Sequence, residues 1–223
     1  YGVVCRGEGV EGMGERMMRC VIVGAAPFTD AQLLKTYIRS GDYVIAADGG
    51  LAHMQALGQE PHVILGDFDS ADRPNFSNVV VFPKEKDQTD SELAIDYAIA
   101  EGYSSIWLIA PFGGRIDHTI ANLNLLRYAH SRGIYLKLYD GENLVYFIGQ
   151  GTYRPDCKYQ YYSFFPMEEN TTISLDGFKY PLDHYVMNGE NSLCVSNEPD
   201  CSELVVEVHQ GLVLCVCIEK ETK

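Results

Sequence analysis

Short apolar runs alternate with amphipathic stretches from residue 20 to about residue 140 of the chain. Continuous short runs of mainly apolar residues are typical of strands buried on both faces of a sheet. They lie at 20–23, 43–47, 62–65, 78–82, 106–110 and 135–138. The stretches between them predict helices over 30–40, 51–57, 90–101 and 117–131. A strand followed by a helix, repeated along the chain, predicts an α/β fold with a doubly wound, mostly parallel sheet.

Two of the predicted helices carry apolar side chains at helical spacing. Leu93 and Tyr97 lie on one stripe of the third helix, and Ile120 and Leu123 lie on one stripe of the fourth. Residues three or four apart share one face of a helix, so these stripes predict the faces that pack inward.

Beyond about residue 140 the helical spacing disappears and short β-rich runs follow one another. They lie at 144–148, 159–165, 171–175, 193–195, 204–208 and 212–218, with turn signals such as Asp176-Gly177 between them. We therefore expect an α/β domain over 17–142 and a smaller all-β sandwich domain over 143–223. Residues 1–16 begin with Tyr and show no periodicity, which favours a leader or a remnant of expression.

The composition predicts a folded globular protein with an acidic surface. Hydrophobic residues make up 46% of the chain, and 31 acidic against 17 basic residues give a formal net charge of −14. This charge argues against nucleic-acid or anionic-membrane partners, and no apolar run approaches the ~20 residues of a membrane span. The seven cysteines have no CxxC pairing with histidines, which favours a reducing, cytoplasmic location over a zinc site or a disulfide framework.

Aspartates stand in short segments that follow predicted strands or open predicted helices. The carboxyl ends of parallel strands meet at one edge of a sheet, where ligands bind in such folds. Carboxylates repel one another, so a cluster of them favours a divalent cation between them. Each segment alone is equally well explained as a turn, because Asp and Gly are common in turns. The aspartates concerned are Asp48, Asp67, Asp69, Asp90 and Asp117.

Asp67 and Asp69 form the sharpest of these signals. Carboxylates two apart on extended backbone point the same way and can share a hard cation. Gly49-Gly50 and Gly113-Gly114 would let a phosphate approach the backbone closely. Lys86 and Arg115 flank these segments and are candidate phosphate partners. No GxxxxGK[ST] motif is present, so phosphate handling must rest on metal, loops and scattered cations.

The segment around Thr89 has a competing explanation. Thr89-Asp90-Ser91-Glu92 is a capping box, which accounts for Thr89 and Glu92 without a ligand. Asp90 opens the helix, where it can complement the helix dipole or face a metal. The sequence leaves these two roles of Asp90 open.

The acidic segments, taken together in their order and spacing, resemble the thiamine pyrophosphokinases of the bacterial type. A weaker match is Ser196-Asn197-Glu198 in the β-rich half, and the resemblance covers roughly residues 18–218. The segments that carry it are Asp48-Gly49-Gly50, Gly66-Asp67-Phe68-Asp69-Ser70, Asp87-Gln88-Thr89-Asp90 and Gly113-Gly114-Arg115-Ile116-Asp117-His118.

The resemblance implies a transferase that moves a pyrophosphoryl group from ATP to thiamine, giving thiamine diphosphate and AMP. It implies an α/β catalytic, ATP-binding domain, a thiamine-binding β-sandwich, and a homodimer with active sites between subunits. It also implies Mg²⁺ held by Asp67, Asp69 and Asp90. The catalytic group it implies is Asp48, Asp69, Asp90 and Asp117. The ATP contacts it implies are Lys86, Gln88, Thr89, Arg115 and His118, and the thiamine contacts are Ser196 and Asn197.

Two rival functions use the same residues. A Mg²⁺-dependent phosphohydrolase or nucleotidyltransferase could be built on the same acidic edge, and a non-catalytic sensor could bind thiamine or a nucleotide. Spacing does not identify which aspartate, if any, accepts the hydroxyl proton. The aromatic residue that would stack on thiamine is likewise unassigned.

Overall fold

The computed structural model describes residues 4–6, 18–28, 31–67, 76–83, 87–113 and 115–219. The chain divides into two compact units, which are described separately. The α/β unit comprises Arg16–Gly141, and the β unit comprises Glu142–Lys223 together with Tyr1–Glu15. The predicted site residues Asp69 and Lys86 lie outside the described residues, as does Gly114.

The α/β unit is built on a sheet whose strands are all parallel within the described residues. The strand order is β7-β6-β2-β3-β4-β5, so the chain begins in the middle, moves outward to β5 and returns to add β6 and β7. Cys20 to Val23 of β2 are fully buried, as their unbroken apolar run predicts. The strands are β2 (Arg19–Val23), β3 (Tyr43–Ala47), β4 (Val63–Gly66), β5 (Val79–Val81), β6 (Ser105–Ile109) and β7 (Tyr135–Tyr139).

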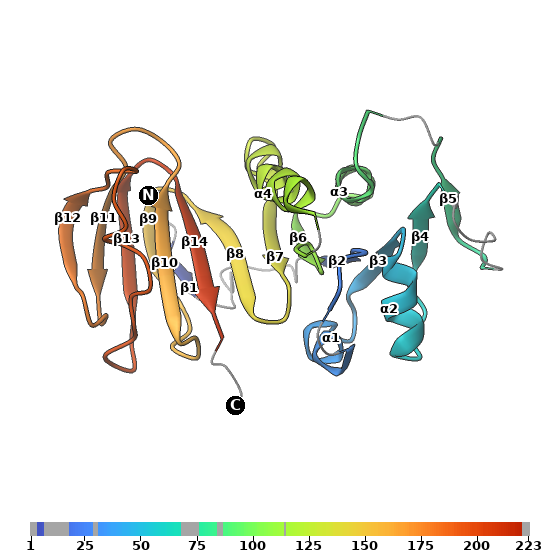
Figure 1. The fold of residues 1–223 in the computed structure, drawn as a ribbon, viewed down its shortest axis with the longest axis horizontal. Coiled ribbons are helices and arrows are strands. Elements are labelled where there is room, and N and C mark those ends of the chain that lie inside the picture. The colour runs from blue at the N-terminus through green and yellow to red at the C-terminus, as the bar shows by residue number, and fades with distance from the viewer. Residues whose placement is uncertain are drawn as a thin grey trace. The chain divides into compact units, whose positions relative to one another are not determined.

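Helices cover both faces of this sheet. Figure 1 shows α1 and α2 on one face and α3 and α4 on the other. Because the chain reverses its direction across the sheet after β5, right-handed crossovers place the later helices on the opposite face. The helices are α1 (Ala31–Tyr37), α2 (Gly50–Ala56), α3 (Asp90–Ala100) and α4 (Ile116–His130).

The inward face of α4 differs from the predicted stripe. Ile120 is 54% exposed, whereas Leu125 and Leu126 are buried on the same side as the polar residue Asn122. The Asn122 amide donates to the carbonyl of Pro111 at 2.6 Å, and this bond directs a polar side chain inward. The positions of apolar residues alone therefore predict the wrong inward face for a helix that buries a hydrogen-bonded polar side chain.

The β unit contains two groups of hydrogen-bonded strands. In one group the order is β10-β14-β8, with antiparallel pairing. In the other group the order is β1-β9-β13-β11-β12, with antiparallel pairing except between β1 and β9. The strands are β1 (Val4–Arg6), β8 (Asn143–Ile148), β9 (Gly151–Arg154), β10 (Tyr161–Pro166), β11 (Thr172–Asp176), β12 (Leu182–Val186), β13 (Val205–Gln210) and β14 (Val213–Ile218).

An aromatic cluster forms part of the core between these two groups of strands. The ring of Phe178, which follows β11, meets the rings of Tyr162 and Phe164 from β10 edge-on, at 5.5 and 5.9 Å between centroids. All three side chains are buried. Aromatic pairs of this geometry add to the stabilisation from burial, so this cluster helps to hold the two layers together.

The strand predicted at 193–195 is wrong, and β9 and β12 were not predicted. Residues 193–195 lie in turns, where the Asn191 side chain accepts the backbone N–H of Leu193. Asn188 does the same for Glu190. Such local side-chain bonds compete with strand pairing.

The segment expected as a leader at 1–16 contributes β1 to the β unit, and the remainder of it lies outside the described residues. In the part of the chain that the structure describes, no helix is long and apolar enough to cross a membrane.

Candidate active site

Two of the predicted aspartates follow neighbouring strands of the α/β sheet. Asp48 comes directly after β3, and Asp67 comes directly after β4, which pairs with β3 in parallel. The backbone N–H of Asp48 donates to the carbonyl of Leu65 at 2.7 Å and ties the two strand ends together. Asp48 is exposed and Asp67 is half-buried. Both aspartates therefore lie at the carboxyl edge of the sheet, as the sequence predicts.

The backbone at this edge turns sharply. Asp48 and Ala110 have φ angles of +47° and +55°, which place two non-glycine residues in the left-handed region. Ala110 follows β6 as Asp48 follows β3. Such conformations cost about 1–3 kcal/mol each and collect at functional sites. Two of them on strand ends of one edge make this edge the candidate site of the α/β unit.

Glycines let the loops at this edge pack closely. A Cβ on Gly50 would lie 1.9 Å from the carbonyl oxygen of Val23, and a Cβ on Gly24 would lie 2.9 Å from that of Ala110. Gly50 therefore has a packing reason of its own, in addition to the phosphate approach predicted for the Gly49-Gly50 pair. The loops after β2, β3 and β6 are held together by backbone contact at these glycines.

Thr89 caps α3. Its Oγ1 accepts the backbone N–H of Glu92 at 3.2 Å, and its extended backbone is typical of an N-cap residue. The capping interpretation of Thr89 is confirmed. Asp90 is the first residue of the helix, where a carboxylate complements the positive end of the helix dipole.

Gln88 points along α3. Its Nε2 donates to Glu92 Oε1 at 3.1 Å and to Asp96 Oδ2 at 2.9 Å. A glutamine amide carries two hydrogens, so both have acceptors within the helix. The predicted contact between Gln88 and ATP can then use only the side-chain oxygen while these bonds persist.

Arg115 and Asp117 are joined at the start of α4. Arg115 Nε donates to Asp117 Oδ1 at 3.1 Å, and Arg115 Nη2 donates to Asp117 Oδ2. The guanidinium holds the pKa of Asp117 below its ordinary value of 3.8, and Asp117 raises the pKa of Arg115. These bonds use two of the five N–H donors of the guanidinium. His118, the next residue, is exposed, and its backbone N–H donates to Asp117 Oδ1 at 2.9 Å.

The side chains predicted to bind magnesium have suitable donor chemistry. Asp67 and Asp90 offer carboxylate oxygens, which are the ligands that Mg²⁺ takes in proteins. The third predicted ligand, Asp69, lies outside the described residues. Among the residues that are described, no three His, Cys, Asp or Glu side chains form a group that could hold a metal ion. The ligand set of Asp67, Asp69 and Asp90 thus stays a prediction.

The predicted thiamine contacts have different environments within the β unit. Ser196 is exposed with φ at +59°, and its backbone N–H donates to Ser163 Oγ at 2.9 Å. Asn197 is 3% exposed. Its Oδ1 accepts the N–H groups of Tyr180 and Glu198, and its Nδ2 donates to the Tyr180 carbonyl at 2.8 Å. Asn197 therefore holds the chain around it, while Ser196 faces outward.

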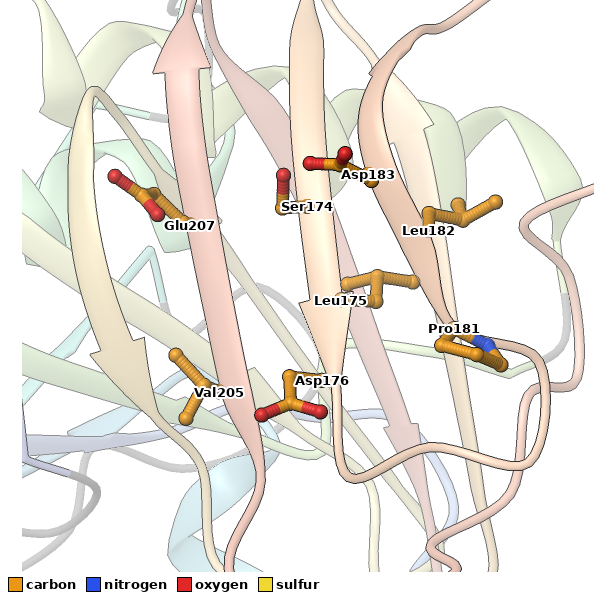
Figure 2. Close-up of a pocket in the computed structure, with 8 residues that line it drawn as sticks. All are labelled: Ser174, Leu175, Asp176, Pro181, Leu182, Asp183, Val205 and Glu207. Atoms are coloured by element: carbon orange, nitrogen blue, oxygen red, sulfur yellow. The ribbon is translucent and has the colours of Figure 1, made fainter.

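Two hollows open on the β unit. The larger, of about 510 Å³, lies over β11, β12 and β13, and Figure 2 shows the carboxylates of Asp176, Asp183 and Glu207 around it. The smaller, of about 210 Å³, is lined by residues that include Phe164, Met187 and Cys194. Cys194 lies two residues before Ser196 in the chain, and neither Ser196 nor Asn197 lines either hollow.

Sequence reasoning missed two residues that are linked to the predicted site residue Gln88, one directly and one through the other. Asp96 binds Gln88, and Tyr128 on α4 donates its hydroxyl to Asp96 Oδ1. Asp96 lies on α3, eight residues beyond Gln88, which precedes the helix. The contact between Asp96 and Tyr128 depends on how α3 and α4 pack together, and no local sequence pattern predicts it.

Both units match models of known families. Residues 34–138 match the thiamin pyrophosphokinase catalytic domain. Residues 152–213 match the thiamin pyrophosphokinase vitamin B1 binding domain. The first match contains Asp48, Asp67, Gln88 and Asp117, and the second contains the residues of the smaller hollow together with Ser196 and Asn197.

Relatives with curated names and solved structures agree with these models. The thiamine pyrophosphokinase of Bacillus subtilis is 31% identical over 182 residues, which cover 77% of this chain and 85% of the relative. A crystal structure of thiamine pyrophosphokinase from Bacillus subtilis superposes with a TM-score of 0.82 at 27% identity, covering 91% of this chain and 99% of that one. A thiamin pyrophosphokinase structure from Geobacillus thermodenitrificans gives 0.79 at 30% identity, covering 92% and 99%.

Proposed function

This chain belongs to the thiamin pyrophosphokinase family, and we propose that it transfers a pyrophosphoryl group from ATP to thiamine to give thiamine diphosphate and AMP. The observation that carries the proposal is the acidic carboxyl edge of the α/β sheet, where Asp48 and Asp67 follow adjacent strands within the part of the chain that matches the catalytic domain. In this reaction the hydroxyethyl oxygen of thiamine bonds to the β-phosphorus of ATP, and the bond from that phosphorus to AMP breaks.

The triphosphate brings several negative charges to an acidic edge, so its binding needs positive charge. Mg²⁺, held by Asp67, Asp69 and Asp90, would neutralise phosphate oxygens and orient the triphosphate for in-line attack. Arg115 supplies a guanidinium whose remaining N–H donors can contact phosphate while Asp117 fixes its orientation. Lys86 and His118 are proposed as further phosphate contacts, and Asp48 as a neighbour of the reacting groups.

We propose that thiamine binds at the β unit beside Ser196. The smaller hollow is lined by aromatic and thioether side chains such as Phe164 and Met187, which suit a flat aromatic cation. The acidic composition of the chain also favours a cationic substrate. Asn197 acts indirectly, because its amide groups hold Tyr180 and Glu198 in place.

Four finer statements complete the proposal. The α/β unit is a doubly wound sheet that binds ATP at its carboxyl edge, a description supported by its strand order and by helices on both faces.

The protein acts as a homodimer with active sites between subunits. Support for the dimer comes from large apolar side chains exposed on the β unit, namely Tyr180, Val186 and Leu193, each more than half exposed. It works in the cytoplasm, which its cysteines without disulfide-like spacing support, and it has no nucleic-acid or membrane partner, which its net charge of −14 supports.

Product analysis tests this function. Purified protein is incubated with ATP, Mg²⁺ and thiamine, and nucleotides and thiamine esters are separated by chromatography. We expect AMP and thiamine diphosphate in equal amounts, and neither without Mg²⁺. Inorganic phosphate without a thiamine ester would indicate a phosphohydrolase, and pyrophosphate release would indicate a nucleotidyltransferase. Binding of thiamine without turnover would indicate a sensor.

A further inference from the structure

The turn that begins α3 is tied to the body of the helix by one side chain. Gln88 lies before the helix, yet its Nε2 reaches Glu92 and Asp96, four and eight residues further along the chain. Glu92 and Asp96 are themselves four residues apart, so their carboxylates lie on one helix face and repel each other. The amide of Gln88 donates to both carboxylates and offsets this repulsion.

The same carboxylate connects α3 to α4. Asp96 Oδ2 accepts from Gln88, and Asp96 Oδ1 accepts the hydroxyl hydrogen of Tyr128. The hydrogen bond to Asp96 raises the pKa of Tyr128, so its hydroxyl keeps its proton and stays a donor. The guanidinium of Arg132 lies over the Tyr128 ring, with its central carbon 3.6 Å from the ring centroid. The side chains of Gln88, Asp96, Tyr128 and Arg132 thus form one continuous series of contacts.

We propose that Asp96 and Tyr128 are positioning residues that act through Gln88 to hold the turn at 87–90 in its binding geometry. This turn carries Thr89, whose Oγ1 caps the helix, and Asp90, which is proposed to face the Mg²⁺ of ATP. The expected effect on ATP binding and turnover rests on the proposed function. The expected effect on the order of the turn in the free protein rests on the observed hydrogen bonds alone.

The network explains why a glutamine stands inside this acidic turn. A glutamine aimed at the nucleotide would keep its amide hydrogens for phosphate oxygens, whereas here both go to Glu92 and Asp96. All four of the side chains of Gln88, Glu92, Asp96 and Tyr128 are half-buried, so water competes only partly with these bonds. The side chain therefore stabilises the loop that presents Asp90.

Hydrogen–deuterium exchange in the ligand-free protein tests the network without any turnover. Gln88→Leu removes both donors at similar size, and Tyr128→Phe removes only the hydroxyl. We expect the amides of Glu92 and Leu93, which bond to Thr89, to exchange about 10-fold faster in both variants. Gln88→Lys keeps a donor that reaches the carboxylates and should retain slow exchange.

A matched control lies on the same helix. Tyr97 also makes a hydrogen bond through its hydroxyl, but to Tyr43 on the sheet. Tyr97→Phe should leave the exchange of Glu92 and Leu93 unchanged, whatever it does to the melting temperature. A general loosening of α3 would instead accelerate these amides in all the phenylalanine variants, and that result would overturn the proposal.

Steady-state kinetics test the catalytic consequence. Gln88→Leu and Tyr128→Phe should raise the KM for ATP about 3- to 10-fold and leave the KM for thiamine unchanged. An unaltered KM for ATP beside faster exchange would overturn the positioning role, and unaltered exchange would overturn the network itself. If the wild-type protein makes no thiamine diphosphate, the proposed function fails, while the exchange experiment still decides whether the network holds the turn.

Discussion

Arg115 donates two hydrogen bonds to the carboxylate of Asp117, although the two side chains are 74% and 59% exposed. Ion pairs so open to water contribute little to folding, because solvent and salt screen them. What the pair does achieve is orientation, since a two-bond contact fixes the plane of the guanidinium. It stands in the first turn of α4, where the helix offers further N–H groups to a phosphate.

Arg115→Lys should separate charge from geometry. Lysine keeps the positive charge but lacks the planar fork that meets Asp117 and a phosphate together. We expect kcat/KM for ATP to fall about 100-fold, as for removal of a transition-state donor, with no change in melting temperature. The matched variant Arg127→Lys, which alters an exposed arginine near the other end of α4, should behave as wild type. Full activity in Arg115→Lys would remove Arg115 from the phosphate site.

The α/β sheet could be predicted from sequence because its strands consist mainly of apolar residues. The run at 43–47 coincides with β3, and the run at 20–23 falls within β2. A strand buried on both faces has no polar position to confuse the pattern. The same pattern located the site edge, since Asp48 and Asp67 follow such strands directly.

The β unit was predicted less well because some of its strands are partly exposed along their whole length. All residues of β9 are half-buried, and β12 includes the exposed Asp183 and His184, so neither strand has a clear alternation. Conversely, Leu193 and Val195 are apolar but exposed, at 59% and 39%, and belong to turns. A short run with two exposed apolar residues can therefore imitate a strand in sequence.

The side-chain contacts at the site could be predicted only where they are local. The cap of Thr89 on Glu92 spans three residues, and the capping pattern announced it. By contrast, Asp96 accepts from Tyr128, 32 residues away, and the Asn197 side chain accepts from Tyr180, 17 residues away. Such hydrogen bonds depend on which residues the tertiary packing brings close together.

Substitutions of Thr89 should distinguish its cap from a contact with ATP. Thr89→Ala removes the acceptor for the Glu92 N–H and should lower the free energy of unfolding by about 1 kcal/mol, measured by urea denaturation. Thr89→Asp keeps a strong cap but adds a negative charge where phosphate is proposed. It should therefore preserve stability while raising the KM for ATP. A KM unchanged in Thr89→Asp would leave Thr89 with the capping role alone.

Adjacent residues of the β unit should respond in opposite ways. Asn197→Leu deprives the backbone of Tyr180 and the N–H of Glu198 of their partners, and should cost about 2–3 kcal/mol of unfolding free energy. Ser196→Ala alters an exposed side chain, so stability should stay within about 0.5 kcal/mol while the KM for thiamine rises. Loss of thiamine binding in Asn197→Leu at unaltered stability would show that Asn197 contacts the substrate directly.

Thiol reactivity should follow burial. Burial, with a smaller effect from Asp42, raises the pKa of Cys20 from 9.0 to about 12, and the side chain is 0% exposed. At pH 8 about one Cys20 in ten thousand is then a thiolate, so iodoacetamide should label exposed Cys201 first and leave Cys20 unlabelled in the native protein. Mass spectrometry of tryptic peptides measures both.

The same shift has a consequence for stability at alkaline pH. The fold disfavours the Cys20 thiolate. Ionisation of Cys20 therefore leaves the free energy of unfolding unchanged below about pH 9 and lowers it progressively as pH rises from 9.0 toward about 12. Cys20→Ser should lessen this alkaline loss, and Cys201→Ser should not. Early labelling of Cys20 at pH 8 would mean that β2 opens locally.

Gly50→Ala sets two effects of opposite sign against each other. Gly50 is the first residue of α2, and alanine would favour a helix there by up to about 1 kcal/mol. The added Cβ would lie 1.9 Å from the carbonyl oxygen of Val23, a backbone atom of a buried strand that cannot move aside. We expect the clash to dominate and to cost about 3 kcal/mol or more. Gly149→Ala, where a Cβ meets nothing within 4 Å, is the control and should be close to neutral. A Gly50→Ala protein as stable as wild type would show that the loops after β2 and β3 can separate, and the tight edge on which Asp48 stands would then be adjustable rather than rigid.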